Sequence, residues 1–425
     1  MNQTSGIYAR HRRVLGASLV GTAVEFYDFY IYATAASLVF GALFFPRVSA
    51  ASGLVASYAT FAVAFVARPI GALVFGHFGD RAGRKATLVA SLVLMGASTF
   101  AIAFLPGYAT LGIWAPVLLC VLRFGQGFGL GGEWGGAALL AVENAPAGHR
   151  GRFGMFPQLG APVGFIAANG LFLVLGLALS AEEFQRFGWR LPFLCSALLV
   201  AVGLWVRLKL TETPAFAALL ARERPADVPL LDVLRDHGAA CLTGTAGVVA
   251  CFAVFYIATA FALGYGTHTL GIPRTTFLGL QLCAILCMAL GIVLAGTLAD
   301  RFTPRRVLIG GAVATMATGA ALAPLFGSGR TAGVLAFLCL ALLVMGFVYG
   351  PLGAWLPGLF PARVRYTGVS LAFNVGGILG GGLAPVIAQE LAERGGLGWV
   401  GAYLGLAGAV TLAGLAAAPV AAGDD

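Results

Sequence analysis

The sequence has 425 residues, of which 59% are hydrophobic and only 10% are charged, and its mean hydropathy is +0.91. These values exclude an ordinary soluble domain, in which about 25% of residues are charged, and they indicate a protein that lies largely within a lipid bilayer. The net charge of +9 does not indicate a nucleic-acid partner, because the basic residues fall in short loops between apolar segments, where membrane topology explains them.

Twelve apolar segments are long enough to cross a bilayer, which takes roughly 20 residues in a helix. The longest polar stretch, at residues 209–238, separates six of them from the other six, so we expect two halves at 1–208 and 239–425 joined by a linker. The predicted fold class is an all-α membrane protein with two pseudo-symmetric six-helix halves. The predicted spans cover residues 14–40, 50–76, 86–105, 111–136, 153–179, 190–208, 239–266, 277–298, 307–326, 331–357, 367–389 and 398–420.

Lys and Arg are divided unequally between the two sets of loops that these spans define. Of the 26 basic residues, 18 lie in the set that includes both termini and the linker, and six lie in the other set. Because cytoplasmic loops are enriched in basic residues, we predict a multi-pass protein of the cell inner (cytoplasmic) membrane with both termini in the cytoplasm.

A charged motif follows the second span and recurs in altered form after the eighth. Residues 76–85 read Gly-His-Phe-Gly-Asp-Arg-Ala-Gly-Arg-Lys, and residues 296–301 read Gly-Thr-Leu-Ala-Asp-Arg. A repeat in corresponding loops indicates two halves of similar structure, which is typical of secondary transporters.

Three short stretches of the sequence resemble the major facilitator superfamily. Residues 76–85 resemble the loop between its second and third helices, and Arg123-x-x-Gln126-Gly-x-Gly resembles its fourth-helix motif. Glu143, followed by Arg150, resembles the acid–base pair after that helix.

Three further stretches resemble one family within it, the metabolite:proton symporters. Residues 25–30 read Glu-Phe-Tyr-Asp-Phe-Tyr, residues 131–136 read Gly-Gly-Glu-Trp-Gly-Gly, and residues 359–368 read Leu-Phe-Pro-Ala-Arg-Val-Arg-Tyr-Thr-Gly. The second stretch is similar to the shikimate-transporter-like branch. The resemblance implies the major facilitator fold and cotransport of protons with shikimate, 2-oxoglutarate, citrate, proline or a betaine. Gly358 stands where the family usually has Glu, so the second half lacks the acid that corresponds to Glu143.

Charged residues in the interior of the predicted spans are confined to the first half, at Glu25, Asp28, Arg68, Arg123 and Glu133. A charge in the hydrocarbon is costly and usually marks a functional site. Glu25 and Asp28 are three residues apart and share a helix face, and two neighbouring carboxylates in a low dielectric cannot both ionise cheaply. We therefore predict proton coupling at Asp28 first, and otherwise at Glu25 or Glu133. The alternative is that these acids only neutralise the two arginines.

Arg123 and Gln126 are one helical turn apart, and the planar fork of an arginine suits a carboxylate. We predict that they bind the anionic group of a substrate, although a structural ion pair is the alternative for Arg123. Arg68 precedes Pro69. We predict that its side chain either lines a central substrate cavity or packs against neighbouring helices. The other predicted substrate contacts are polar or aromatic side chains of the spans, namely Tyr27, Tyr256, Tyr349, Trp355 and Asn374.

Charges at the cytoplasmic helix ends are predicted to form a gate. Asp80 is expected to lie against the span that begins near Thr367, because a carboxylate is stabilised at a helix N-terminus. A purely topological role is the alternative. The predicted gating residues are Asp80, Arg81, Arg84, Glu143, Arg150, Asp300 and Arg301.

No enzyme activity is predicted, because the spans contain no nucleophile–base set and no metal-ligand cluster. The glycine-rich stretch at 125–136 follows no strand and lacks a Gly-Lys-Ser/Thr end, which argues against a nucleotide loop. We expect no catalytic residue, cofactor or metal, and a monomer whose partners are a small substrate, protons and the bilayer. The predicted function is proton-coupled uptake of a small organic acid by alternating access. The alternative is a facilitator or efflux carrier of a small metabolite or betaine.

Overall fold

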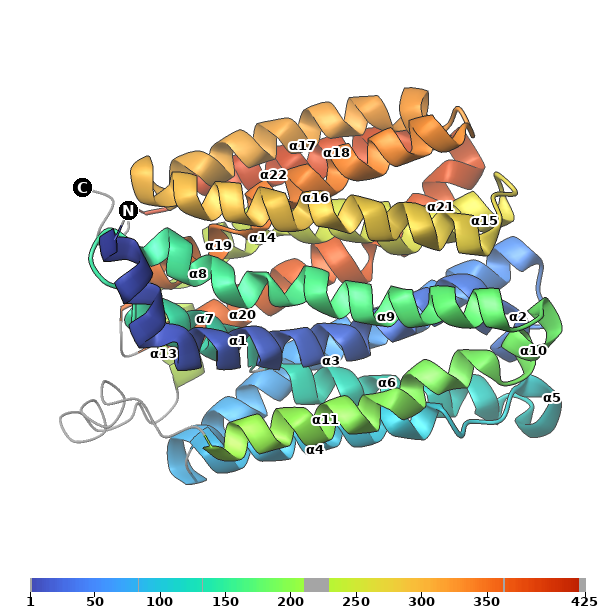
Figure 1. Ribbon diagram of the computed structural model, residues 1–425, viewed down its shortest axis with the longest axis horizontal. Helices are drawn as coiled ribbons and strands as arrows, with labels where there is room; N and C mark the ends of the chain where they lie inside the picture. Colours follow the sequence, from blue (N-terminus) through green and yellow to red (C-terminus); the bar gives the residue numbers. More distant parts are fainter. Residues whose placement is uncertain (1, 83, 132, 210–228, 362–363, 420–425) are drawn as a thin grey trace.

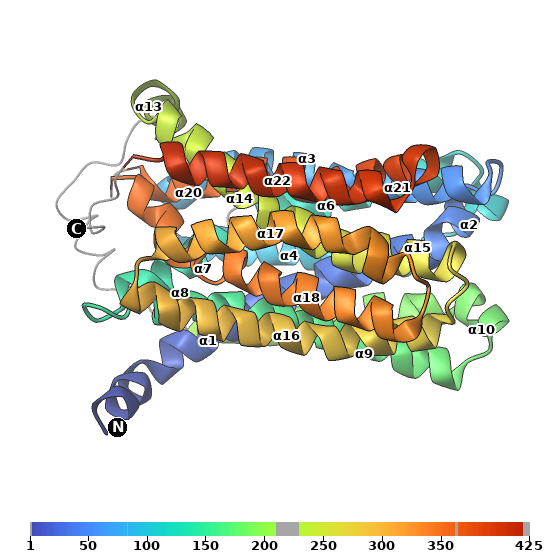
Figure 2. The same ribbon diagram turned by 90° about the horizontal axis from the view of Figure 1, so that it is seen from above.

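The structure is a computed structural model that describes residues 2–82, 84–131, 133–209, 229–361 and 364–419, with the backbone alone at 2–10, 12–14, 76–82, 84–88, 206–207, 209 and 229. Its long helices run side by side along one axis, and the two chain ends lie at the same end of the bundle (Figures 1 and 2). We call this the terminal end and the other the opposite end. The shared position of the two chain ends fits an even number of crossings.

The first half is made of long helices with short helices in its loops. The long helices are α1 (Asn2–Ala35), α3 (Ala50–Ala82), α4 (Arg84–Ile102), α6 (Trp114–Leu130), α7 (Glu133–Glu143), α8 (Arg150–Gln158), α9 (Gly160–Ala178) and α11 (Leu191–Lys209). The short elements are η1 (Ala36–Phe40), α2 (Gly41–Phe44), α5 (Tyr108–Leu111), α10 (Ala181–Arg186) and η2 (Gly188–Arg190).

The second half follows the short helix α13 (Pro229–Asp236). Its long helices are α14 (Gly238–Tyr256), α16 (Arg274–Arg301), α17 (Pro304–Phe326), α18 (Thr331–Tyr349), α20 (Arg365–Gly377), α21 (Ala384–Gly395) and α22 (Leu397–Ala417). The short elements are η3 (Ile257–Phe261), α15 (Ala262–His268), α19 (Leu352–Trp355), η4 (Leu356–Leu359) and η5 (Ile378–Gly382).

The all-α membrane fold class is confirmed. Within the described ranges, eleven helices are long and apolar enough to span a bilayer. The predicted span at 86–105 corresponds to α4, whose apolar stretch Val89–Ile102 is shorter. The predicted span at 111–136 extends further, because α6 and α7 together run from Trp114 to Glu143.

Three spans contain a π-helical segment: η1 between α1 and α2, η3 between α14 and α15, and η5 between α20 and α21. A π-helical turn leaves backbone carbonyls out of the regular ladder, and such turns are frequent at functional sites. Two of the three, η1 and η3, face each other across the boundary between the halves, since Ser37 of η1 donates a hydrogen bond to the Ala260 carbonyl of η3.

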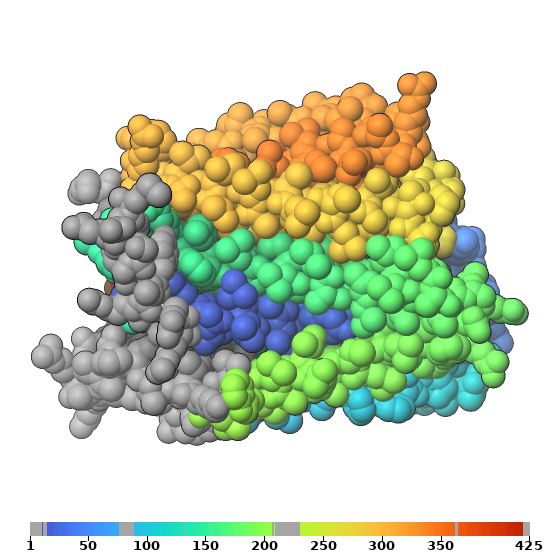
Figure 3. Space-filling model, in the orientation of Figure 1, coloured from blue at the N-terminus to red at the C-terminus, as the bar shows by residue number. Residues whose placement is uncertain are grey.

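The two halves meet along two seams, one between α8 and α9 and helix α16, the other between α3 and the elements α20, η5 and α21. In the space-filling view, α8 and α9 lie directly against α16 (Figure 3). Glycines allow the closest approaches, since a Cβ at Gly151 of α8 would lie 2.6 Å from the Gly296 carbonyl oxygen of α16. Small residues permit such backbone contact in lipid, where apolar area alone does not drive association.

The packing of α3 on α6 sets the position of both buried arginines. A Cβ at Gly127 would overlap the backbone of Ala64, and one at Gly131 would overlap the Arg68 carbonyl. We expect Gly127→Ala to push α3 and α6 apart and to destabilise the protein by about 1–3 kcal/mol, the usual effect of overpacking. The measurement is the melting temperature of the purified protein in detergent.

The matched control is Gly170→Ala in α9, where a Cβ would meet nothing within 4 Å. That variant should melt at the wild-type temperature or above it, because alanine favours a helix over glycine by about 1 kcal/mol. Equal melting temperatures for the two variants would contradict the close packing of α3 on α6.

Candidate functional site

Arg123 lies inside the first half and is fully buried. Its guanidinium carbon lies 3.9 Å from the ring centre of Tyr32, 4.2 Å from that of Phe29 and 4.8 Å from that of Phe61. Aromatic faces attract a desolvated cation by about 2 kcal/mol or more. The rings therefore stabilise a charge that water does not reach.

Gln126 fixes the guanidinium from one turn along α6. Nη1 of Arg123 donates to the Gln126 side-chain oxygen, while the Gln126 nitrogen donates to the Asp28 carbonyl at 3.0 Å and to the Thr99 hydroxyl at 2.9 Å. The predicted pair of Arg123 and Gln126 is therefore in contact. It joins helices α1, α4 and α6 within the first half, and Tyr256 of the second half is an electrostatic partner of Arg123.

Arg68 has two electrostatic partners in the second half, Tyr256 and Tyr349. Its guanidinium carbon lies 4.2 Å from the ring centre of Phe29 and 4.6 Å from that of Phe65, and only 8% of the residue is exposed. Its Nε has no hydrogen-bond partner among the described residues. Its electrostatic partners are Glu25 and three tyrosines, two of them from the second half, and these tyrosines are Tyr30, Tyr256 and Tyr349.

The three predicted acids are all buried, but they do not pair as expected. The electrostatic partner of the Asp28 carboxylate is Glu133 of α7, whereas Glu25 is an electrostatic partner of Arg68 and Tyr349. The Oε1 atom of Glu133 accepts a 2.8 Å hydrogen bond from Ser91. The fully buried Asp28 carboxylate adjoins Thr99, and neither of its oxygens has a hydrogen bond of ordinary geometry within the described ranges.

Tyr256 and Tyr349 bring the second half to this centre. The Tyr256 ring lies 5.1 Å from that of Phe61 and 5.6 Å from that of Phe65, and the Tyr349 ring lies 6.4 Å from that of Phe26. These are ordinary edge-to-face distances. Both predicted tyrosines therefore lie where the halves meet.

The remaining predicted contacts lie elsewhere. The Tyr27 hydroxyl donates to the Pro192 carbonyl at 2.9 Å, inside the first half. Trp355 packs against Gly247, where a Cβ would lie 2.6 Å from the indole ring. Asn374 donates to the Gly131 carbonyl at 2.8 Å and so joins the two halves.

At the terminal end, Asp300 closes the boundary between the halves. Its Oδ1 accepts hydrogen bonds from the backbone N–H groups of Gly151 at 2.7 Å and Arg152 at 3.4 Å, and its Oδ2 lies 3.3 Å from Nε of Arg152. Gly151 and Arg152 form the first turn of α8, so the carboxylate binds a helix N-terminus.

Other contacts at this end differ from the predicted gate. Glu143 lies 3.9 Å from Arg365 of the second half, while Arg150 is exposed at the start of α8. Arg301 lies over Phe302, 5.5 Å from its ring centre, and not at the interface. Arg152 and Arg365, absent from the predicted gating set, contact Asp300 and Glu143 at this end. The side chains of Asp80, Arg81 and Arg84 lie outside the described residues.

A stacked pair of rings also closes the terminal end. Trp134 of α7 and Phe373 of α20 lie 3.6 Å apart with an angle of 3° between the ring planes. The Trp134 indole donates to the Gln158 side chain at 3.1 Å, and Gln158 donates to the Tyr349 carbonyl at 3.0 Å. Both halves therefore meet tightly on this side.

The opposite end is closed by hydrogen bonds to a single carbonyl. Ser37 and Tyr58 of the first half donate to the carbonyl of Ala260 in η3, at 3.1 and 2.8 Å. A nitrogen of His268 lies 3.1 Å from the Ser37 carbonyl oxygen. With contacts at both ends, the centre of the bundle is enclosed.

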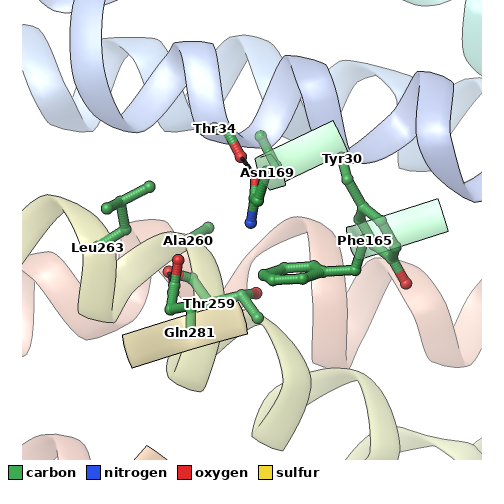
Figure 4. Close-up of a pocket in the computed structure, with 9 residues that line it drawn as sticks. Tyr30, Thr34, Phe165, Asn169, Thr259, Ala260, Leu263 and Gln281 are labelled. Carbon is green, nitrogen blue, oxygen red and sulfur yellow. Dashed lines mark hydrogen bonds between the residues drawn. The ribbon is translucent and has the colours of Figure 1, made fainter. Parts of the chain in front are cut away.

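Between the two closures lies a small cavity, with free space for about one water-sized group (Figure 4). Helices α1 and α9 of the first half and η3, α15 and α16 of the second half contribute its lining. Its polar lining residues are Tyr30, Thr34, Asn169, Thr259 and Gln281. The sequence predictions missed all five, although the signal was present in Asn169 and Gln281, which are amides within long apolar segments. No cluster that could hold a metal ion occurs in the part of the chain that the structure describes.

Known proteins match this chain over nearly its whole length. The sugar (and other) transporter family matches residues 14–237. The inner membrane metabolite transport protein YhjE of Escherichia coli is 51% identical, over 94% of this chain and 92% of the relative. The shikimate transporter of Escherichia coli is 38% identical, over 90% of this chain and 88% of the relative.

A third relative and a solved structure complete the comparison. The proline/betaine transporter of Salmonella typhimurium is 32% identical, over 90% of this chain and 78% of the relative. A solved structure of the proton:xylose symporter XylE, of the major facilitator superfamily, has a TM-score of 0.75, with 16% identity, over 97% of this chain and 95% of that one. The chain therefore belongs to the sugar (and other) transporter family and has the fold of the major facilitator superfamily, and it is a multi-pass metabolite transporter of the inner membrane.

The Asp300 contact generates a prediction. Asp300→Asn keeps an oxygen for the Gly151 N–H but loses the charge that favours the N-terminus of α8, a contribution of about 0.3–2 kcal/mol. The population that is open at the terminal end should therefore rise roughly 2- to 30-fold. Spin labels at positions 150 and 306, in a cysteine-free background, would report this as a longer distance component.

The matched control is Glu390→Gln, which removes the exposed 2.9 Å ion pair with Arg394 within α21, away from the boundary. It should leave the label distances unchanged. An Asp300→Asn distance distribution identical to wild type would mean that the carboxylate does not hold the halves together.

Proposed function

We propose that this metabolite transporter takes up a small organic acid together with protons, by alternating access between its two halves. The observation that carries the proposal is the position of Arg68. It is a buried guanidinium at the centre of the bundle, next to tyrosines of both halves, with its Nε unpaired among the described residues. A carboxylate that entered the centre would supply the missing partner.

Arg68 suits anion recognition better than Arg123 does. An arginine presents a planar fork of donors that matches a carboxylate. Gln126 engages only Nη1 of Arg123, and its Nε and Nη2 have no hydrogen-bond partner among the described residues, but rings of the first half enclose the guanidinium. Arg68 contacts rings on α1 and α3 and faces Tyr256 and Tyr349 of the second half, so a ligand bound to it would touch both halves.

The proton is proposed to bind at Asp28, with Glu133 as its partner. An ionised carboxylate that is buried without hydrogen bonds is costly, and a second carboxylate nearby adds repulsion. The Asp28 carboxylate is buried without a hydrogen bond of ordinary geometry among the described residues, and Glu133 is the second carboxylate near it. We propose that the two acids share the transported proton, because neighbouring carboxylates in a low dielectric cannot both ionise cheaply.

Alternating access needs two closures that open in turn. The Asp300 contact and the Trp134–Phe373 stack support a closure at the terminal end, and the Ala260 hydrogen bonds support one at the opposite end. Substrate and proton couple only if each binds the enclosed state more tightly than the open ones. A ligand that bridges Arg68 and the second half meets that condition.

A betaine carrier is the second candidate, because the proline/betaine transporter is a relative and aromatic rings can bind a quaternary ammonium. The central rings, however, already stack on arginines, since Arg68 covers Phe29 and Phe65 and Arg123 covers Phe61. A ligand cation would meet two positive charges there. The arrangement therefore favours an acid.

Asp28→Asn tests the proton site. The amide holds the site neutral, as in the protonated form, so the protein cannot release a proton. We expect gradient-driven accumulation to be lost, whereas counterflow of substrate across the membrane is retained, because exchange needs only the loaded form. Both are measured in the same proteoliposomes with an imposed pH gradient and a panel of labelled organic acids and betaines.

Two controls accompany that measurement. Glu183→Gln changes an exposed acid of α10 outside the bundle and should accumulate substrate normally. Glu133→Gln should lower accumulation as well, since it alters the coupled pair. Wild-type accumulation by Asp28→Asn, with its pH dependence intact, would refute Asp28 as the proton site.

Arg68→Lys tests substrate recognition. The lysine keeps the charge but loses the fork, so the apparent affinity for the acid should fall about tenfold, the equivalent of roughly 1.4 kcal/mol. Arg123→Lys should lower the melting temperature and change the affinity less. Arg274→Lys is the matched control, because Arg274 also stacks on a ring, that of Phe184, at the opposite end. If Arg123→Lys lowers the apparent affinity for the acid more than Arg68→Lys does, Arg123 and not Arg68 binds the substrate.

A further inference from the structure

The cavity of Figure 4 contains an unpartnered acceptor. The Gln281 side chain of α16 is fully buried, and its nitrogen donates to the carbonyls of Ala258 at 3.2 Å and Thr259 at 2.9 Å. Because these two bonds fix the orientation of the amide, its oxygen is left facing the cavity, and it has no hydrogen-bond partner among the described residues.

Asn169 supplies the complementary donor from the other half. Its oxygen accepts a 2.5 Å hydrogen bond from the Thr34 hydroxyl, so the Asn169 amide is oriented with its nitrogen free to donate. In Figure 4 that nitrogen points from α9 into the space beside Phe165 and Gln281. The cavity thus presents one donor from the first half and one acceptor from the second.

Only certain chemical groups satisfy both amides at once. A hydroxyl accepts from Asn169 and donates to Gln281. A carboxylate has no proton to donate, a quaternary ammonium has neither a donor nor an acceptor, and a methylene leaves both amides unsatisfied, which is unfavourable for buried polar groups. The pair therefore selects a hydroxyl.

We propose that Asn169 and Gln281 form a hydroxyl-binding subsite, and that the substrates are carboxylic acids that carry at least one hydroxyl group. The inference rests on the proposed function, because it takes the carboxylate to be bound by Arg68. Tyr30 joins the two positions, since it lines the cavity and is an electrostatic partner of Arg68. One compact ligand can therefore reach both.

The size of the cavity agrees with a subsite. Its free space holds about one water-sized group, far less than the roughly 300–1,000 Å³ that is typical of a whole ligand pocket. It accommodates a single hydroxyl group, while the carboxylate lies nearer Arg68. A site built to bind a hydroxyl rejects the analogue that lacks it, so the subsite acts on specificity.

The test compares matched acids in substrate counterflow by full-length protein in proteoliposomes. The pairs are shikimate and cyclohexene-1-carboxylate, malate and succinate, and glycerate and propionate, with glycine betaine as a further competitor. For at least one pair, wild-type protein should prefer the hydroxylated acid by about tenfold or more, as the loss of partners for two buried groups implies. In Gln281→Met and in Asn169→Ala, that ratio should fall to near one.

Two further variants keep the test decisive. Gln389→Met is the matched control, because Gln389 is a buried glutamine with an unpartnered oxygen within the described ranges that does not line the cavity. It should keep the wild-type ratio. If Gln281→Met does not fold, Thr34→Val replaces it, since it removes only the bond that orients Asn169 and should lower the same ratio.

The outcomes separate this inference from the proposed function. If each pair competes equally in wild type, or if the ratio survives in the Asn169 and Gln281 variants, the hydroxyl subsite is refuted. The organic-acid function still stands in that case, provided that Arg68→Lys weakens both members of a pair. If no acid competes and glycine betaine does, the proposed function itself fails.

Discussion

Two guanidinium groups must be kept charged inside one six-helix half that is surrounded by lipid, and most of the central packing follows from that constraint. The ring of Phe29 contacts both groups, since the guanidinium carbons of Arg68 and Arg123 each lie 4.2 Å from its centre. Further aromatic rings from α1 and α3 surround the two guanidinium groups, and aromatic faces stabilise a cation without a counter-charge. Of the three buried acids, only Glu25 is an electrostatic partner of Arg68, while Glu133 is that of Asp28. The glycines that let α6 approach α3 follow from the same need, since wider spacing would separate Arg123 from Phe61.

The two closures differ in kind. The terminal end is held by a carboxylate at a helix N-terminus and by stacked rings, whereas the opposite end is held by two hydroxyls on one carbonyl of a π-helical turn. A π turn supplies that carbonyl because its ladder is irregular. Bonds of this number and size contribute a few kcal/mol at most, which is the scale on which a ligand can shift a population.

The sequence predicted the fold class, the family and the set of buried charges, because intramembrane ionisable residues are rare and long apolar segments are unambiguous. It could not predict their partners. Spacing placed Glu25 beside Asp28 on one helix face, yet Glu133 from another helix is the acid that acts on Asp28. Likewise, a motif pointed to Arg123, and only the packing of the halves shows that Arg68 faces the centre. Helix spacing gives neighbours along one helix, whereas tertiary packing decides neighbours between helices.

The order of residues in α7 links the proposed proton site to the closure at the terminal end. Glu133, the partner of Asp28, is followed directly by Trp134, which stacks on Phe373 of the second half and is held by Gln158. Gln158 in turn donates to the Tyr349 carbonyl, and Tyr349 is an electrostatic partner of Arg68. A change of charge at Glu133 therefore acts one residue away from the contact that holds the halves together. The proposed substrate and proton sites thus reach the same closure through contiguous contacts, as coupling between two ligands requires.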